Sequence, residues 1–131
     1  MATTLTTRAL GTAVVGGRIL VGGGTLVAPR VMGRTFGIAA DDVVALPYVG
    51  RLFGARAVFM ALLLATSRGP ERRRQLRAGV AVDVVDAFAA LAAGRRNDLD
   101  RRATRLACAA ALAEASMGLA LLALTRQPTG D

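Results

Sequence analysis

Five ionisable side chains lie near the middle of stretches that are otherwise apolar: Arg18, Arg56, Asp83, Asp86 and Glu114. A charged group at the centre of a bilayer costs about 2.5–3.5 kcal/mol even on insertion scales. Guanidinium and carboxylate groups in such surroundings are therefore expected to pair with one another. A carboxylate that is left without an arginine can bind a proton or another cation. We expect the five residues to form one midspan charge network.

The acidic members of this network outnumber the basic ones. Asp83 and Asp86 are three residues apart, so they share one face of a helix. Two arginines against three carboxylates leave one negative charge uncompensated if every group is ionised. Because desolvation and a neighbouring like charge both favour the protonated form, we expect one of the acids to carry a proton near neutral pH. Proton binding is therefore one chemistry that the network allows.

Most familiar catalytic arrangements are missing from the chain. It contains no histidine and a single cysteine, Cys108, so it lacks the usual general base and the thiolate cluster of zinc or iron–sulfur sites. The glycine-rich segment 16–24 contains no G-x-G-x-x-G motif for a dinucleotide. Asp83 and Asp86 have the spacing of metal–diphosphate motifs, but those motifs stand in richer acidic clusters. We expect no metal, no cofactor and a non-enzymatic role.

Four apolar stretches must position these residues: about 9–28, 47–66, 76–93 and 103–125. A bilayer core about 30 Å thick is crossed by about 20 apolar residues of helix, which is close to the length of each stretch. Hydrophobic residues make up 53% of the 131 residues, more than in an ordinary soluble protein. We predict an all-α fold, a four-helix transmembrane bundle, as one membrane domain over residues 1–131. The third stretch carries two acids, so its insertion depends on its neighbours.

Small residues share helix faces with most of the charges and predict where helices touch. The predicted helix-packing positions are Gly11, Gly22, Gly50, Gly54, Gly79 and Gly118. Glycine at such positions lets helix backbones approach closely within lipid. The simplest geometry docks a basic first hairpin against an acidic second one. The sequence also predicts a tight basic turn over 67–75 and a helix stop at Gly94.

The distribution of basic residues bears on partners and location. All 17 basic residues are arginine, the net charge is +8, and most arginines lie between the apolar stretches, as at helix ends near lipid headgroups. The expected partners are membrane lipids, with anionic headgroups as one option, and a second copy or a partner membrane protein. Nucleic acid is not expected, because no aromatic residues interleave with the arginines.

Composition also bears on the source of the chain. The absence of lysine beside abundant alanine, glycine and arginine suggests GC-rich bacterial DNA, and hence a multi-pass protein of the bacterial cytoplasmic (inner) membrane. The arginines are divided almost evenly between the two predicted sides of the membrane, so they do not set an orientation.

One pattern of motifs runs through most of the chain. Gly17-Arg18, Ala28-Pro29-Arg30, Gly54-Ala55-Arg56 and Asp83-x-x-Asp86 follow one another over about residues 8–125. Their order and spacing resemble those of a family of short bacterial four-span integral membrane proteins of unknown function. The resemblance implies a membrane fold and supplies no reaction. An acid often follows the G-A-R triplet in that pattern, and this chain has Ala57 there.

These observations favour a small integral membrane protein with a structural or accessory role, held together by the midspan network. The alternative is proton- or cation-coupled transport of a small substrate, which in so small a bundle requires a homo-oligomer or a partner subunit. A third interpretation, from another class, is a soluble or peripheral helical bundle that binds an apolar ligand.

Overall fold

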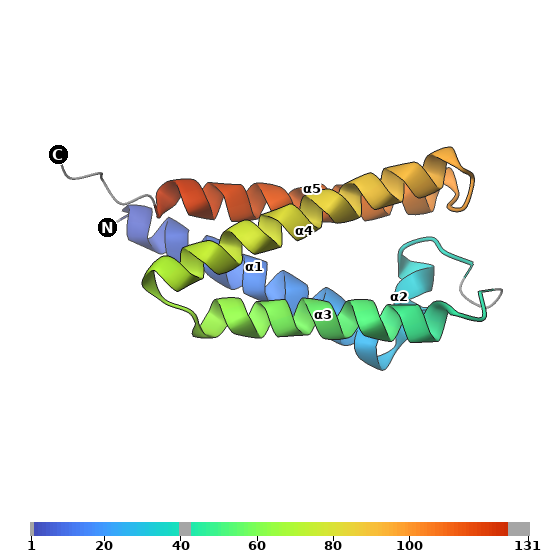
Figure 1. The fold of residues 1–131 in the computed structure, drawn as a ribbon, viewed down its shortest axis with the longest axis horizontal. Helices are drawn as coiled ribbons and strands as arrows, with labels where there is room; N and C mark the ends of the chain where they lie inside the picture. Colours follow the sequence, from blue (N-terminus) through green and yellow to red (C-terminus); the bar gives the residue numbers. More distant parts are fainter. Residues whose placement is uncertain (1, 40–42, 126–131) are drawn as a thin grey trace.

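The computed structural model describes residues 2–39 and 43–125, and over these residues the fold is all-helical (Figure 1). The helices are α1 (Ala2–Val27), α2 (Pro29–Thr35), α3 (Leu46–Thr66), α4 (Gly69–Arg95) and α5 (Arg101–Leu124). The predicted all-α class is confirmed. Helix α1 packs along α3, and α4 packs along α5, so the molecule consists of two helix hairpins. The short helix α2 lies in the connection of the first hairpin.

Three helices are long and apolar enough to cross a membrane, over Leu5–Val27, Leu46–Thr66 and Arg101–Leu124. The fourth span predicted from the sequence is not confirmed by this criterion, because α4 does not meet it. Helix α4 begins with a run of arginines and carries Asp83 and Asp86 farther along. These charges lower the mean hydropathy of the helix below that of the other three.

The start of α4 differs most from the predicted boundaries. The sequence predicted a turn over 67–75, but α4 already begins at Gly69. Pro70 lies in the first turn of α4, where a backbone N–H would have no partner within the helix, so its missing N–H costs nothing. Glu71 accepts hydrogen bonds from Arg74 at 2.9 Å and from Gln75 at 2.6 Å, and such pairs one turn apart stabilise a helix. The basic segment therefore forms helix instead of loop.

The end of α4 also differs from the prediction. Gly94 does not stop the helix, which continues to Arg95. A Cβ on Gly94 would collide with the side chain of Thr104 on α5, so this glycine serves close packing within the second hairpin. Asn97 takes the left-handed backbone conformation, with φ of 61°, in the loop that follows. Asp100 then caps α5, because its side chain accepts a hydrogen bond from the Ala103 N–H at 2.7 Å.

The apolar core where the hairpins meet lies at one end of the molecule. Each long helix contributes one buried residue to it: Val14, Leu64, Leu76 and Leu121. This end also holds the short α3–α4 connection, whereas the hairpins diverge toward α2 and the α4–α5 loop (Figure 1). The two hairpins therefore form a V that is closed at the core and open at the other end.

Within the first hairpin, contact is close enough to involve backbone. A Cβ on Gly54 would lie 2.6 Å from the backbone nitrogen of Leu26, and one on Gly22 would lie 2.7 Å from the Ala57 Cβ. A Cβ on Gly50 would lie 2.9 Å from the Cβ of Pro29 in α2. Only glycine fits at such distances, which is how small residues bring helices together in lipid.

Candidate functional site

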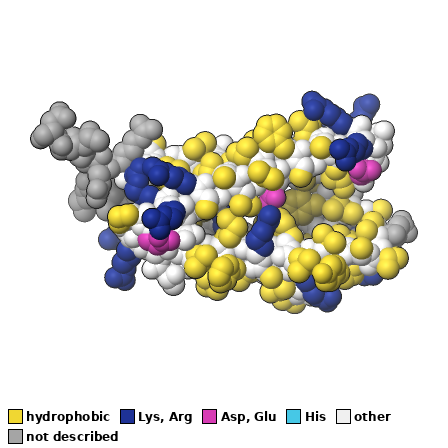
Figure 2. Space-filling view, in the orientation of Figure 1, with side chains coloured by type: hydrophobic (Ala, Val, Ile, Leu, Met, Phe, Trp, Pro, Cys, Tyr) yellow, Lys and Arg dark blue, Asp and Glu magenta, His cyan; other side chains and the backbone are white. Residues whose placement is uncertain are grey.

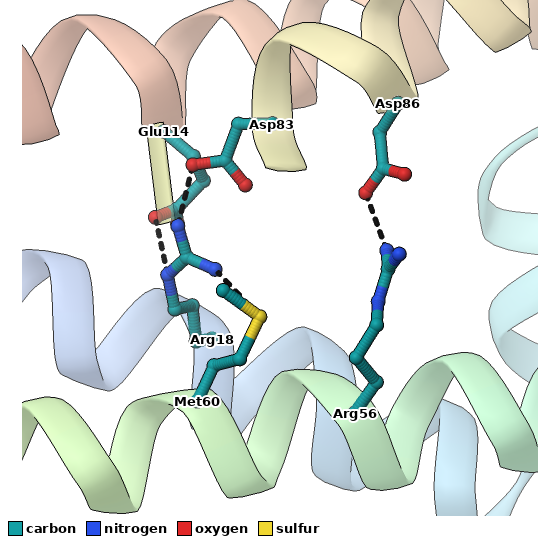
Figure 3. Close-up of polar contacts among 6 residues, drawn as sticks. All are labelled: Arg18, Arg56, Met60, Asp83, Asp86 and Glu114. Carbon is teal, nitrogen blue, oxygen red and sulfur yellow. Dashed lines mark hydrogen bonds and ion pairs between the residues drawn. The ribbon is translucent and has the colours of Figure 1, made fainter. Parts of the chain in front are cut away.

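Arg18 of α1 joins the two hairpins. Its Nη2 donates to the Oδ2 of Asp83 on α4, and its Nε lies 3.8 Å from the Oε2 of Glu114 on α5 (Figure 3). The Arg18 and Asp83 side chains are each 9% exposed. Since each group is buried, the charge of one is compensated mainly by the other and not by solvent.

A second ion pair crosses between the hairpins about one turn farther toward the open end. Arg56 of α3 donates to the Oδ2 of Asp86 on α4 at 2.5 Å (Figure 3). The Arg56 side chain is 44% exposed, and its guanidinium carbon lies 5.3 Å from the centre of the Phe53 ring. The structure thus places Arg56 against α4.

The five residues of the predicted network thus form two groups of ion pairs. Both of its arginines come from the first hairpin, and all three of its acids come from the second. Glycines make room for the larger group. A Cβ on Gly79 would lie 3.1 Å from the Arg18 Nη2, and one on Gly17 would overlap the Glu114 carboxylate. Gly79 was among the predicted packing residues.

Two residues of this group were missed by sequence reasoning. Gly17 was named in the Gly17-Arg18 motif but was not among the six predicted packing positions, and Met60 of α3 was not singled out at all. The Met60 sulfur lies 4.0 Å from the Arg18 Nη1. The sequence does not reveal the contacts of these two residues, because those contacts depend on which helix each residue faces.

The remaining predicted packing glycines also lie at close approaches. A Cβ on Gly11 would lie 2.8 Å from the Nη2 of Arg72, and one on Gly118 would lie 2.6 Å from a methyl group of Val80. The first of these contacts joins the start of α4 to α1, and the second packs α5 against α4.

A cleft of about 670 Å³ lies between the hairpins and opens toward the end that holds α2. Its volume is within the range of pockets that hold small molecules. Alanines of α4 and α5 form one wall: Ala89, Ala90, Ala93, Ala103, Ala107, Ala110 and Ala111. Larger apolar side chains from the first hairpin and α2 form the other wall, including Val49, Phe53, Met32 and Phe36. Both ion-pair groups line the deep end of the cleft.

Not every oxygen of these carboxylates is bonded. The Oε2 atom of Glu114 is buried and accepts no hydrogen bond from any described residue. The pairs of Asp83 and Asp86 each use Oδ2 alone, and Figure 3 shows the other oxygen of each aspartate outside these pairs. The deep end of the cleft therefore has acceptor capacity that the arginines leave unused.

The surface of the molecule divides into an apolar middle and two basic ends. Figure 2 shows hydrophobic side chains over the length of the helices, the hollow of the cleft between the hairpins, arginines gathered at both ends, and one basic side chain beside an acidic one near the middle. Large apolar side chains that point outward include Leu20, Phe59, Val85, Phe88 and Leu119. At the closed end, Arg73 donates to the Thr125 carbonyl at 2.6 Å, which joins the start of α4 to the end of α5.

Comparisons of the chain with protein-family models, with curated proteins and with solved structures give no match. The functional argument therefore rests on the geometry above.

Proposed function

We propose that this chain is a multi-pass integral membrane protein of the bacterial cytoplasmic membrane. In this proposal all four long helices cross the bilayer as a four-helix bundle, and the role is structural or accessory and not enzymatic. The midspan charge network is the contact that holds the second hairpin to the first within the membrane. The resemblance to short bacterial four-span proteins of unknown function agrees with this proposal and stays a prediction.

One observation carries the proposal: each aspartate of α4 is paired with an arginine of the first hairpin. Hydropathy alone counts these charges as if they faced lipid. An intramembrane charge that is paired inside a bundle avoids most of that cost. The outward side of α4 is apolar, since Val85 and Phe88 are 63% and 67% exposed.

The length of α4 also supports a membrane crossing. It has 27 residues, which corresponds to about 40 Å of helix, more than the roughly 30 Å of a hydrocarbon core. Its first turns, with Arg72 to Arg74, would then lie at the headgroup level, where arginine side chains reach the interface.

The number of spans is tested by the side of the membrane on which two positions lie. Arg68→Cys and Asp98→Cys, at exposed positions before and after α4, are introduced separately into a Cys108→Ala background and labelled with a membrane-impermeant maleimide. Four spans predict that the two cysteines react from opposite sides. Labelling from the same side would mean that α4 does not cross, and release of the protein by alkaline carbonate would refute membrane integration altogether.

The cleft favours a second candidate function, namely proton- or cation-coupled transport of a small substrate as a homo-oligomer or as a subunit. A cavity that ends at carboxylates is an arrangement used for such coupling. Infrared difference spectroscopy of the carboxyl bands tests this candidate, with Asp83→Asn, Asp86→Asn and Glu114→Gln for assignment. A carboxyl group that titrates between about pH 6 and 8 would support coupling, because its protonation would then change under physiological conditions. If the protonation states stay constant over this range, only the structural role remains supported.

A further inference from the structure

The cleft between the hairpins combines an apolar wall with a charged deep end. Its lining side chains do not fill it, and about 670 Å³ is open to an occupant. The alanine wall of α4 and α5 accepts bulk without specific shape, because each alanine contributes only a methyl group. The cleft therefore suits a compact apolar body better than a long polar chain.

The charges at the deep end determine which occupant fits. Arg18 and Arg56 supply two positive charges, and Asp83, Asp86 and Glu114 supply three negative ones, so the fully ionised group has a net charge of −1. Both guanidinium groups are already engaged with carboxylates. An anion would have to displace a carboxylate from one of them, whereas a cation would meet an excess negative charge.

The carboxylate oxygens that accept no hydrogen bond also favour a cation as the occupant. The Glu114 Oε2 is buried without a hydrogen bond, and its distance of 3.8 Å to the Arg18 Nε exceeds hydrogen-bond length. The second oxygens of Asp83 and Asp86 take no part in the ion pairs (Figure 3). These acceptors belong to the same part of the cleft lining, next to the apolar walls.

We propose that the cleft binds a monovalent organic cation, with its charge beside Glu114 and Asp83 and its apolar body against the alanine wall. This inference goes beyond the structural role and gives the transport candidate a class of substrate. A bound cation would replace the proton that otherwise balances the third carboxylate. Its failure is distinguishable from failure of the proposed membrane fold, because the labelling experiment reports the fold without any ligand.

The test uses two probes of matched shape and opposite charge, tetraphenylphosphonium and tetraphenylborate. Each has four phenyl groups around one central atom, so a difference in binding reports charge and not size. Binding of radiolabelled probe is measured to the full chain in lipid nanodiscs, with empty nanodiscs subtracted. The expected result is saturable binding of tetraphenylphosphonium, with no saturable binding of tetraphenylborate. Equal binding of both probes, or binding of neither, would overturn the proposal.

Two variants place the site. Glu114→Gln removes the excess negative charge and should weaken tetraphenylphosphonium binding by about tenfold or more, since the lost charge lies in a poorly solvated site. Glu71→Gln is the matched control, because Glu71 is exposed and pairs with Arg74 outside the cleft, and it should bind like the unmodified chain. An unchanged affinity in Glu114→Gln would overturn the placement of the charge.

A third variant keeps the proposal testable if Glu114→Gln fails to fold. Ala107 of α5 is half-buried and lines the cleft away from the ion pairs. Ala107→Phe fills the cavity without changing any charge, so it should abolish saturable binding while the melting temperature stays the same or rises. Full binding by a folded Ala107→Phe protein would show that the cation lies elsewhere and would overturn the proposal.

Discussion

Removing the Arg18 guanidinium should destabilise the fold far more than removing that of Arg56. Both arginines pair with an aspartate of α4, so a simple count of ion pairs predicts equal effects. Their surroundings differ, however. Arg18 and Asp83 are each 9% exposed, whereas Arg56 is 44% and Asp86 is 30% exposed, toward the cleft.

The magnitudes follow from this difference in burial. Arg18→Gln would leave Asp83 buried and unpaired, and loss of one partner of a buried pair costs about 3–5 kcal/mol of unfolding free energy. In Arg56→Gln, Asp86 stays partly exposed at the cleft, so the loss should be close to that of an exposed pair, about 0.2–1 kcal/mol. Replacing the buried pair, as in Arg18→Met with Asp83→Leu, should recover part of the loss, because Asp83 is then no longer a buried unpaired charge, although Glu114 still lacks its arginine.

The native cysteine provides the assay. Cys108 is the single cysteine of the chain, it is half-buried, and its thiol lies 3.6 Å from the Ala87 carbonyl oxygen across the second hairpin. Separation of α4 from α5 would expose it to a thiol-reactive dye. The extent of labelling is followed while dodecyl sulfate is added to protein in mild detergent, and the midpoints of the variants are compared.

Three results would refute the reasoning. Equal midpoints for Arg18→Gln and Arg56→Gln would mean that burial does not set the strength of the two pairs. An Arg18→Gln midpoint equal to that of the unmodified chain would mean that the pair does not contribute to the stability of the second hairpin, which the thiol reports. A double variant no more stable than Arg18→Gln would mean that the unpaired Asp83 carboxylate is not the cause of the loss.

Two further predictions concern packing and capping. Gly54→Ala should lower the unfolding free energy by about 1–3 kcal/mol, because the new methyl group would meet the backbone of Gly22 and Leu26 and push α1 away from α3. Gly23→Ala is the control, since a Cβ there would meet open space. A larger loss in the control would contradict the packing argument. Asp100→Ala should cost about 1 kcal/mol through loss of the α5 cap, measured by the same cysteine assay, whereas Asp100→Asn should retain most of the stability.

Hydropathy and residue type predicted the long helices and singled out the five charged residues near the middle of the apolar stretches. The apolar stretches correspond to α1, α3, the later part of α4, and α5. They could be predicted because a helix needs about 20 apolar residues to cross a hydrocarbon core. The boundaries of α4 were wrong where local signals misled. Gly69-Pro70 and the arginine run looked like a turn, and Gly94 looked like a helix stop, although both belong to the helix.

The pairing of individual residues could not be predicted from the sequence. Helical periodicity shows which residues share a face of one helix, but it does not show which face of another helix they meet. The role of Gly17 beside Glu114 depends on the rotation of α1 relative to α5. The cleft was equally beyond prediction, because it results from the angle at which the two hairpins diverge from the core of Val14, Leu64, Leu76 and Leu121.

The separation of arginines and acids between the two hairpins has a consequence for biogenesis. In the four-span protein proposed above, α1 and α3 are synthesised before α4, so Arg18 and Arg56 leave the ribosome before Asp83 and Asp86 do. The least apolar helix would then enter the bilayer third, after the two helices that carry its partners. A chain with the order of the hairpins exchanged would have to hold α4 outside the bilayer until its arginines arrived.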